Sequence, residues 1–174
     1  MKKIIYPVAA ILLIAGSAFT FIQAQDWKIA DNYSVKFESK DPSGEFKGLK
    51  GNIKFDAGNL AASKFNVSID VASINTGNGM QNTHAKSANW FDAEKYPSII
   101  FKSTAIAKTA SGYQATGTLD MHGVQKEISI PFTFNNNTFA ATFEVNRNDF
   151  GIGKPDHDKV PPALKVSLSV PVTK

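Results

Sequence analysis

The feature that most constrains this chain is a two-residue alternation of apolar and polar side chains, which runs from Trp27 almost to the C-terminus. In the run EISIPFTF, for example, Ile128, Ile130, Phe132 and Phe134 share one face. Because successive side chains of a strand point to opposite faces, this pattern predicts half-buried strands. No segment of a dozen residues shows the spacing of an amphipathic helix. We therefore expect an all-β, antiparallel fold.

Eight segments carry the alternation, with approximate bounds 33–39, 46–55, 65–74, 99–107, 112–122, 126–134, 139–146 and 163–172. Stretches rich in Gly, Asn and Ser at 109–112, 122–125 and 135–138 predict three successive hairpins. Pro131 cannot donate a backbone hydrogen bond, so we expect a bulge or an unpaired edge there. Eight one-sided strands close into a barrel or stack as a sandwich, and the pattern alone does not distinguish a filled interior from a hollow one.

Two connections, 75–97 and 147–162, are longer than hairpins require. Long ordered loops in compact β domains are usually lids, binding loops or coverings of a mouth. The first contains the run NTHAKSANWFDAEKYP, which predicts a turn or two of helix from Thr83 to Asn89. Pro97 then favours extended backbone, where the next strand can begin. We expect a long, partly helical lid loop.

The N-terminus resembles a secretory leader, because a basic start precedes an apolar run over 4–22 that ends in small and polar residues near Ala24. This predicts a signal peptide over 1–24, cleaved near Ala24, and one domain over 25–174. The alternative is an uncleaved anchor, since the run is long enough to span a bilayer. The chain has no cysteine, so we expect a periplasmic or secreted protein without disulfides.

The distribution of charged residues and the absence of known motifs argue against several functional classes. The 19 basic and 15 acidic residues are mixed along the chain, which argues against a nucleic-acid partner. Asp156, His157 and Asp158 are consecutive, and adjacent side chains of an extended segment point apart, so no metal site is predicted. The sequence has no G-x-S-x-G or H-E-x-x-H motif, no phosphate-binding glycine loop and no nucleophilic cysteine, so no catalytic residue is predicted.

Three segments in order resemble the signatures of the YceI-like polyisoprenoid-binding family, and the resemblance extends over nearly the whole chain after the leader. They are 73–103 with the element YPSIIFKS, 117–134 with GTLDMHGVQK, and 143–153 with NRNDFGI. Trp90 and His122 depart from common family choices and bear on the headgroup preference.

The resemblance implies an eight-stranded, lipocalin-like antiparallel barrel whose tunnel holds a long amphiphilic lipid, such as a polyprenyl chain or a quinone tail. It further implies a binding or carrier protein rather than an enzyme, with no cofactor and only transient membrane contact. The oligomeric state stays open, a homodimer included. The expected tunnel-lining residues are Phe37, Phe55, Phe65, Val67, Ile69, Val71, Ile99, Phe101, Leu119, Met121, Ile130, Phe132, Phe143 and Val145.

The expected mouth residues are Trp90, Phe91, Tyr96, Arg147 and Asp149, and each has a plainer interpretation. Phe91 and Tyr96 are of the type that anchors a loop to a barrel end, and Trp90 fits either role. Arg147 and Asp149 would share one side of an extended strand, where they fix a headgroup or form a structural ion pair.

Two broader alternatives also remain. Composition alone favours a solid hydrophobic core over a tunnel. For function, the alternatives to a lipid carrier are a periplasmic enzyme acting on an amphiphile held in the tunnel and a closed structural domain with protein partners.

Overall fold

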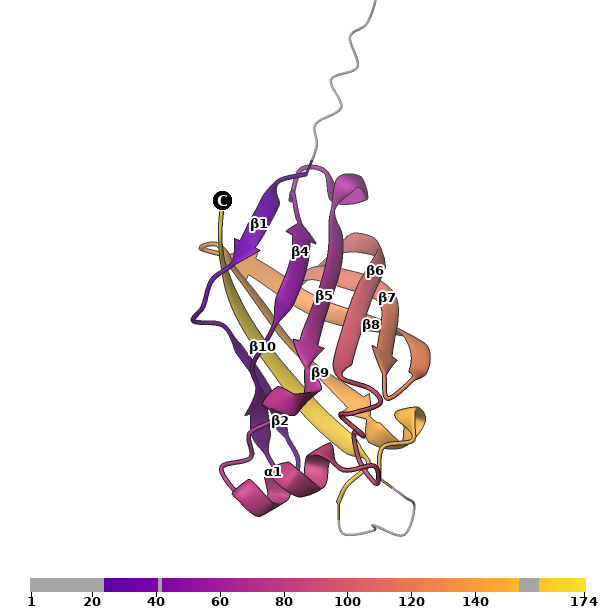
Figure 1. Ribbon diagram of the computed structural model, residues 1–174. Coiled ribbons are helices and arrows are strands. Elements are labelled where there is room, and N and C mark those ends of the chain that lie inside the picture. The colour runs from indigo at the N-terminus through magenta and orange to yellow at the C-terminus, as the bar shows by residue number, and fades with distance from the viewer. Residues whose placement is uncertain (1–23, 41, 154–159) are drawn as a thin grey trace, which may run out of the picture.

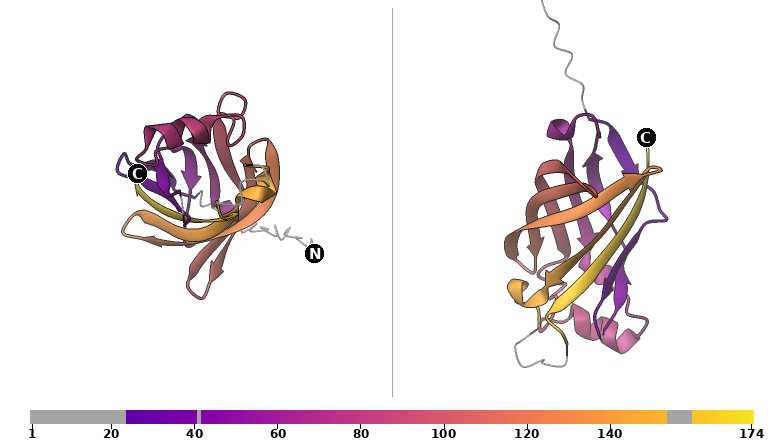
Figure 2. Two further views of the ribbon diagram at one scale, coloured as in Figure 1. Left: turned by 90° about the horizontal axis from the view of Figure 1, so that it is seen from below. Right: turned by 180° about the vertical axis from the view of Figure 1, so that it is seen from behind.

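The computed structural model describes residues 24–40, 42–153 and 160–174. They form one continuous antiparallel sheet in the order β1-β4-β5-β6-β7-β8-β9-β10-β2-β3, shown in Figures 1 and 2. The strands are β1 (Asp26–Ile29), β2 (Ser34–Glu38), β3 (Gly44–Phe46), β4 (Lys50–Lys54), β5 (Lys64–Asp70), β6 (Ser98–Thr109), β7 (Gly112–Met121), β8 (Val124–Asn135), β9 (Thr138–Asn146) and β10 (Ala163–Thr173).

The sheet closes on itself because β1 pairs with both β4 and β10. Strand β1 pairs with the C-terminal end of β10, and β2 pairs with its earlier part, from Lys165 to Ser169. Strand β3 pairs with β2. Strands β1 and β2 therefore together take the place of one strand of the barrel, with an interruption between them. Strands β3 and β4 do the same at the next position. The result is a closed, eight-stranded antiparallel barrel, as the family resemblance implied, and the sandwich that the alternation left open is not formed.

Two predicted strand segments differ from the structure: 65–74 runs past the end of β5 at Asp70, and 46–55 falls in an interrupted strand of the barrel. The segment 46–55 is divided between β3 and β4, because Gly48 adopts a left-handed backbone with φ of 70°. The Tyr33 hydroxyl accepts a hydrogen bond from the Leu49 amide at 3.0 Å and holds this break. Strand β1 was not predicted, since four residues are too few to show a two-residue period.

The three predicted hairpins are confirmed. The turn between β7 and β8 has His122 and Gly123 at φ of 54° and 75°, and the turn between β8 and β9 has Asn136 and Asn137 at 49° and 55°. Positive φ at both central residues defines the two-residue turn whose twist matches that of the flanking strands. Histidine and asparagine tolerate this conformation better than most residues.

Strand β8 pairs with β7 from Val124 to Phe132 but only briefly with β9. Its ladder with β9 spans four residue pairs, from Asn135 opposite Thr138 to Phe132 opposite Ala141. Pro131, the next residue, faces Gln114 of β7. The predicted unpaired edge at Pro131 is therefore confirmed among the described residues, and the ribbons of β8 and β9 diverge beyond it (Figure 1).

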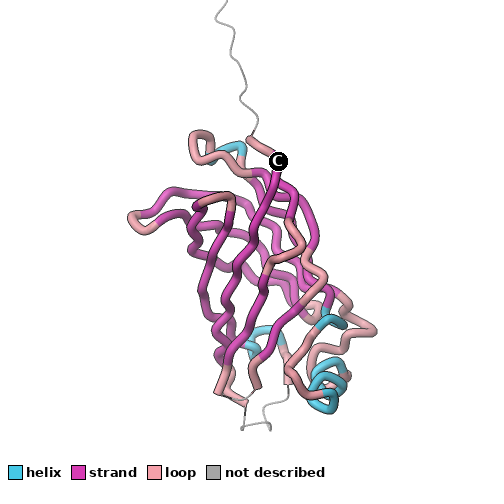
Figure 3. Tube along the Cα trace, turned by 90° about the vertical axis from the view of Figure 1, so that its left-hand side faces the viewer, coloured by secondary structure: helices cyan, strands magenta, loops and turns pink. Residues whose placement is uncertain are grey.

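The loop after β5 crosses one end of the barrel, beside which the helix lies in Figures 1 and 3. Helix α1 (Gly79–Lys86) begins four residues before the predicted Thr83, because the Asn78 side chain caps it by accepting the amide hydrogens of Met80 and Gln81. Shorter 3₁₀ turns are η1 (Leu60–Ala62), η2 (Val71–Ser73) and η3 (Arg147–Phe150). Among the described residues, none of the helices is long and apolar enough to cross a bilayer.

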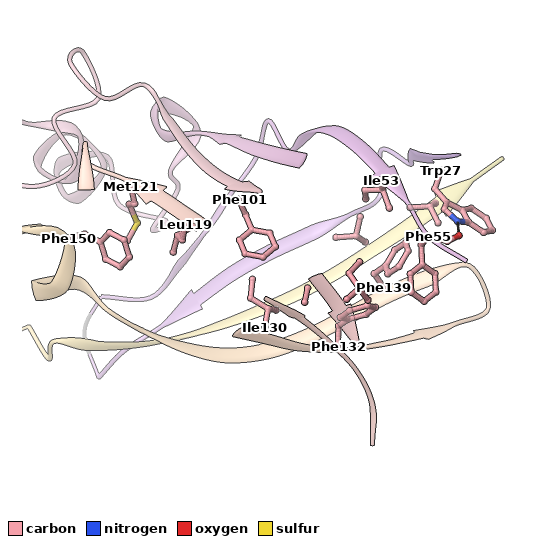
Figure 4. Close-up of a cluster of buried hydrophobic side chains, with 14 of the residues drawn as sticks. Trp27, Ile53, Phe55, Phe101, Leu119, Met121, Ile130, Phe132, Phe139 and Phe150 are labelled. Atoms are coloured by element: carbon pink, nitrogen blue, oxygen red, sulfur yellow. Dashed lines mark hydrogen bonds between the residues drawn. The ribbon is translucent and has the colours of Figure 1, made fainter. Parts of the chain in front are cut away.

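An aromatic cluster fills the opposite end of the barrel, where β1 closes the ring. Its centre is Phe55, which is 1% exposed, and the Trp27 indole nitrogen donates a hydrogen bond to the Phe55 carbonyl at 3.0 Å. Figure 4 shows these two residues at the far end of the row of buried side chains. Five rings surround Phe55 at centroid distances of 5.1 to 6.3 Å, most of them edge to face, and they are Phe65, Tyr113, Phe132, Phe134 and Phe139.

Candidate binding cavity

The interior between the aromatic cluster and α1 is hollow. The cavity has a volume of about 960 Å³, near the upper end of the range for small-molecule sites in proteins. Inward side chains from β2 and from β4 to β10 line it, and Figure 4 shows Phe101 and Ile130 facing its middle. Phe65, Val67 and Phe143 are only half-buried although they belong to the wall, because they border this space. The solid-core interpretation is therefore wrong for this part of the barrel.

The floor of the cavity is aromatic. Phe65, Phe132 and Phe139 line the cavity at the end where Phe55 packs behind them. Phe65 and Phe132 lie 5.3 Å apart between ring centroids, and Phe65 and Phe139 lie 5.5 Å apart. Because this layer is backed by further rings, the cavity is blind at the β1 end.

The mouth lies at the α1 end and carries most of the polar groups of the site. Among the described residues that line the cavity, the polar ones are Lys36, Thr76, Gln81, His84 and Arg147. Three of these belong to α1 or the loop leading into it, so a bound molecule would meet an apolar interior first and polar groups only at the entrance.

One side chain on α1 is unusual for its exposure. Met80 lines the cavity and yet is 83% exposed, so it forms part of the rim. A flexible thioether chain at a rim adapts to ligands of different shape.

Most of the predicted tunnel residues line the cavity. They are Phe37, Phe65, Val67, Ile69, Ile99, Phe101, Leu119, Met121, Ile130, Phe132, Phe143 and Val145. Two predicted residues do not. Phe55 lies behind the floor, and Val71 belongs to η2, because Asp70 ends the strand by accepting the amide hydrogen of Ala72 at 2.9 Å. The geometry places side chains around the cavity, and ligand contact by each of them stays a prediction.

Of the five predicted mouth residues, Trp90, Phe91 and Arg147 border the cavity. The Phe91 ring packs edge to face on Phe46 at 5.8 Å, so it also anchors the loop. Trp90 lies between the His84 ring at 5.7 Å and the Arg147 guanidinium at 5.5 Å. Trp90 therefore joins α1 to the segment that follows β9.

Arg147 is 4% exposed, and its guanidinium donates hydrogen bonds to backbone carbonyl oxygens. It donates hydrogen bonds to the carbonyl oxygens of Ile152 and Val160, both at 2.8 Å, and longer ones to those of Gly153 and Pro161. These carbonyls flank both sides of the connection between η3 and β10. Arg147 thus fastens the second long loop to the barrel, and the ion pair expected between Arg147 and Asp149 is not what the structure shows.

Tyr96 and Asp149 lie outside the cavity, which corrects their predicted placement. The Tyr96 ring packs on His122 at 4.8 Å and covers Gly123 in the turn between β7 and β8. Its hydroxyl hydrogen bond raises the pKa of the exposed Lys95. Asp149 forms an ion pair with Lys126 at 3.5 Å on the surface, because the strand ends at Asn146 and η3 rotates this side chain outward.

Sequence reasoning missed the lining residues that come from α1, namely Met80, Gln81, His84 and Ala85. The signal available was Asn78, a strong helix N-cap residue, placed before a run with no proline. It also missed Ala115 and Ala141, which lie on inward positions of β7 and β9. Their small side chains leave the room that larger residues would fill.

No group of three or more His, Asp or Glu side chains that could hold a metal ion occurs within the described part of the chain. The Asp156–Asp158 stretch lies outside the described residues, and the absence of a metal site stays a prediction.

A small closed barrel with one blind apolar cavity is an architecture suited to holding a hydrophobic ligand. The model of the YceI-like domain matches residues 16–173, and this chain belongs to the YceI-like family. A UPF0312 protein of Pseudomonas putida (strain GB-1) is 36% identical over 142 residues, which cover 75% of this chain and 71% of that protein.

Solved structures agree on the fold. Burkholderia cenocepacia BcnA superposes with a TM-score of 0.78 at 28% identity, over 84% of this chain and 100% of that one. A Campylobacter jejuni YceI protein gives 0.64 at 24% identity, over 79% and 88% of the two chains. A polyisoprenoid-binding domain from Saccharophagus degradans gives 0.60 at 15% identity, over 85% and 97%. The last two likenesses concern the fold alone.

Proposed function

We propose that this protein binds one long-chain isoprenoid, or a lipid with a similar apolar tail, in the barrel cavity and acts as its carrier or reservoir. The observation that carries the proposal is the blind cavity of about 960 Å³ with an apolar wall and polar groups gathered at its mouth. Membership of the YceI-like family supports it. The Saccharophagus degradans domain, whose fold is similar, is described as binding polyisoprenoids.

The energetics favour a long tail. An isoprenoid tail has almost no hydrogen-bonding groups, so it loses none on entering an apolar wall. Each buried methylene contributes about 0.8 kcal/mol, so ten carbons contribute about 8 kcal/mol. Association costs about 4 to 15 kcal/mol in lost translational and rotational freedom, so a tail of one or two isoprene units binds weakly and a longer tail binds tightly.

We propose a binding role without catalysis, in the periplasm or after secretion. The leader-like segment 1–24 supports the location. The polar lining supports the absence of catalysis, because Arg147 is engaged with backbone carbonyls and the other polar groups stand at the rim. A carrier of this kind meets the membrane only when it loads or releases its lipid.

The test is native mass spectrometry of the protein purified from a bacterial lysate that contains membranes, followed by extraction and identification of any bound molecule. We expect a stoichiometric isoprenoid-type lipid. Ala141→Trp should abolish loading, because residue 141 lines the cavity opposite Phe132. Ala140→Trp is the matched control, since Ala140 is exposed on the outer face of the same strand. A folded protein that stays empty with every prenyl lipid offered would overturn the proposal.

A further inference from the structure

We infer that the aromatic floor acts as a ruler: Phe65, Phe132 and Phe139 set an upper limit on the length of the apolar tail that this cavity accepts. The inference rests on the proposed lipid binding and goes beyond it by naming the residues that select among lipids of one class.

The limit follows from the way the floor is built. Phe65, Phe132 and Phe139 come from three different strands, and all three border the cavity. Behind them Phe55 is 1% exposed and touches each of the three rings. Trp27 in turn holds the Phe55 carbonyl from β1, at 3.0 Å. A tail cannot pass this layer unless a well-packed cluster of rings is dismantled.

The cavity volume converts into a length. A water-sized group occupies about 30 Å³, so 960 Å³ corresponds to about 30 such groups. A flexible tail does not fill an irregular space completely, so we place the limit at about 20 to 30 carbons, which is four to six isoprene units.

Longer tails must leave carbons outside. If the headgroup stays at the polar mouth, a longer tail cannot extend past the floor, and its surplus carbons remain in water or force the lid loop open. When lipids compete for the cavity from detergent micelles, a tail shorter than the limit moves from the apolar micelle into the apolar cavity. Its length therefore has little effect on relative loading. Each methylene above the limit loses about 0.8 kcal/mol, which is about fourfold in relative loading.

The test uses prenyl alcohols of increasing length, from C10 to C55, offered in equimolar pairs from detergent micelles, with the loaded fraction read by native mass spectrometry. We expect relative loading to vary little among tails up to C20 to C30. Each further isoprene unit should then lower it by 100-fold or more, on the basis of about fourfold for each of its carbons. The quantity of interest is the chain length at which loading falls.

Two variants move the limit in opposite directions. Phe132→Ala removes a ring about the size of one isoprene unit from the floor, so the fall should shift to longer tails by about one unit. Ala141→Leu adds bulk beside the floor, because Ala141 lines the cavity and pairs with Phe132, and the fall should shift to shorter tails. The matched control is Ile128→Ala, since Ile128 lies on the same strand as Phe132 and is not one of the residues that line the cavity.

The outcomes separate the two proposals. If no prenyl alcohol loads, the proposed function itself fails. If all lengths load without a fall, or if the fall stays at the same length in both Phe132→Ala and Ala141→Leu, lipid binding stands and the ruler is refuted. Loading would also fail to decrease with chain length if the tail left the cavity between β8 and β9, where these strands diverge, and this result would likewise refute the ruler. Should Phe132→Ala prove unfolded by circular dichroism, Ala141→Leu decides alone.

Discussion

Replacing Arg147 tests whether this buried cation holds the mouth of the barrel together or holds a ligand. The side chain is 4% exposed and donates two short hydrogen bonds, at 2.8 Å each, to the carbonyl oxygens of Ile152 and Val160. The Arg147→Met variant keeps much of the volume and removes every donor. The carbonyls on both sides of the second long loop then lose the charged partner that joins them.

The expected magnitude comes from these contacts. Hydrogen bonds to charged groups contribute about 1.5 to 3 kcal/mol each, so the two short bonds give about 3 to 6 kcal/mol. The methionine variant no longer has to bury a charge, which offsets part of this loss. We therefore expect the free energy of unfolding to fall by about 3 kcal/mol, and the Tm to fall by about 10 °C for a chain of this size.

The assay is urea denaturation followed by circular dichroism, with lipid loading measured on the same samples. The matched control is Asp149→Asn, which breaks the exposed ion pair with Lys126 and should change stability by less than 1 kcal/mol. A variant of Arg147 with unchanged stability and lost loading would refute our reasoning and favour the sequence-based alternative that this residue fixes a headgroup.

Three further predictions follow from packing and capping. Phe55→Ala should lower the free energy of unfolding by about 3 to 5 kcal/mol in urea denaturation, because the ring is 1% exposed among five others; a loss below 1 kcal/mol would contradict the closed end described above. Gly123→Ala should lower the Tm and displace Tyr96, since a Cβ there would lie 2.5 Å from that ring and φ is 75°; unchanged near-ultraviolet circular dichroism would count against it. Asn78→Ala should speed amide hydrogen exchange in α1, in line with a cap worth about 1 kcal/mol, while exchange in β7 stays unchanged; equal protection of α1 in both proteins would disprove the capping role.

Local chemistry explains what was predictable in the fold. The faces of the strands from β5 to β10 follow from alternation, which depends only on the geometry of an extended chain. The three hairpins follow from residues that tolerate positive φ. Strand β1 was not predictable in this way, because its four residues matter through distant partners, β4 and β10, rather than through their own pattern.

The residues of the candidate site likewise fall into those that local sequence patterns predicted and those that depend on distant contacts. Inward residues such as Phe101 and Leu119 were identified because they continue the alternation of long strands. The expected pairing of Arg147 with Asp149 and the expected place of Asp149 at the mouth were wrong, because that argument assumed an extended backbone where the chain turns into η3. The lining from α1 was missed because a lid packs on residues far away in the sequence.

The sequence by itself determined that this chain would form an antiparallel β-barrel or β-sandwich with an apolar inner face, since side-chain direction in a strand is a local property. Only the tertiary structure decided that the inner face surrounds a cavity of about 960 Å³ instead of a filled core. The physical reason is that empty space depends on how far facing side chains reach across a closed ring. Phe55 and its neighbours meet and fill one end, whereas small inward residues such as Ala141, beside the aromatic floor, leave space above that end.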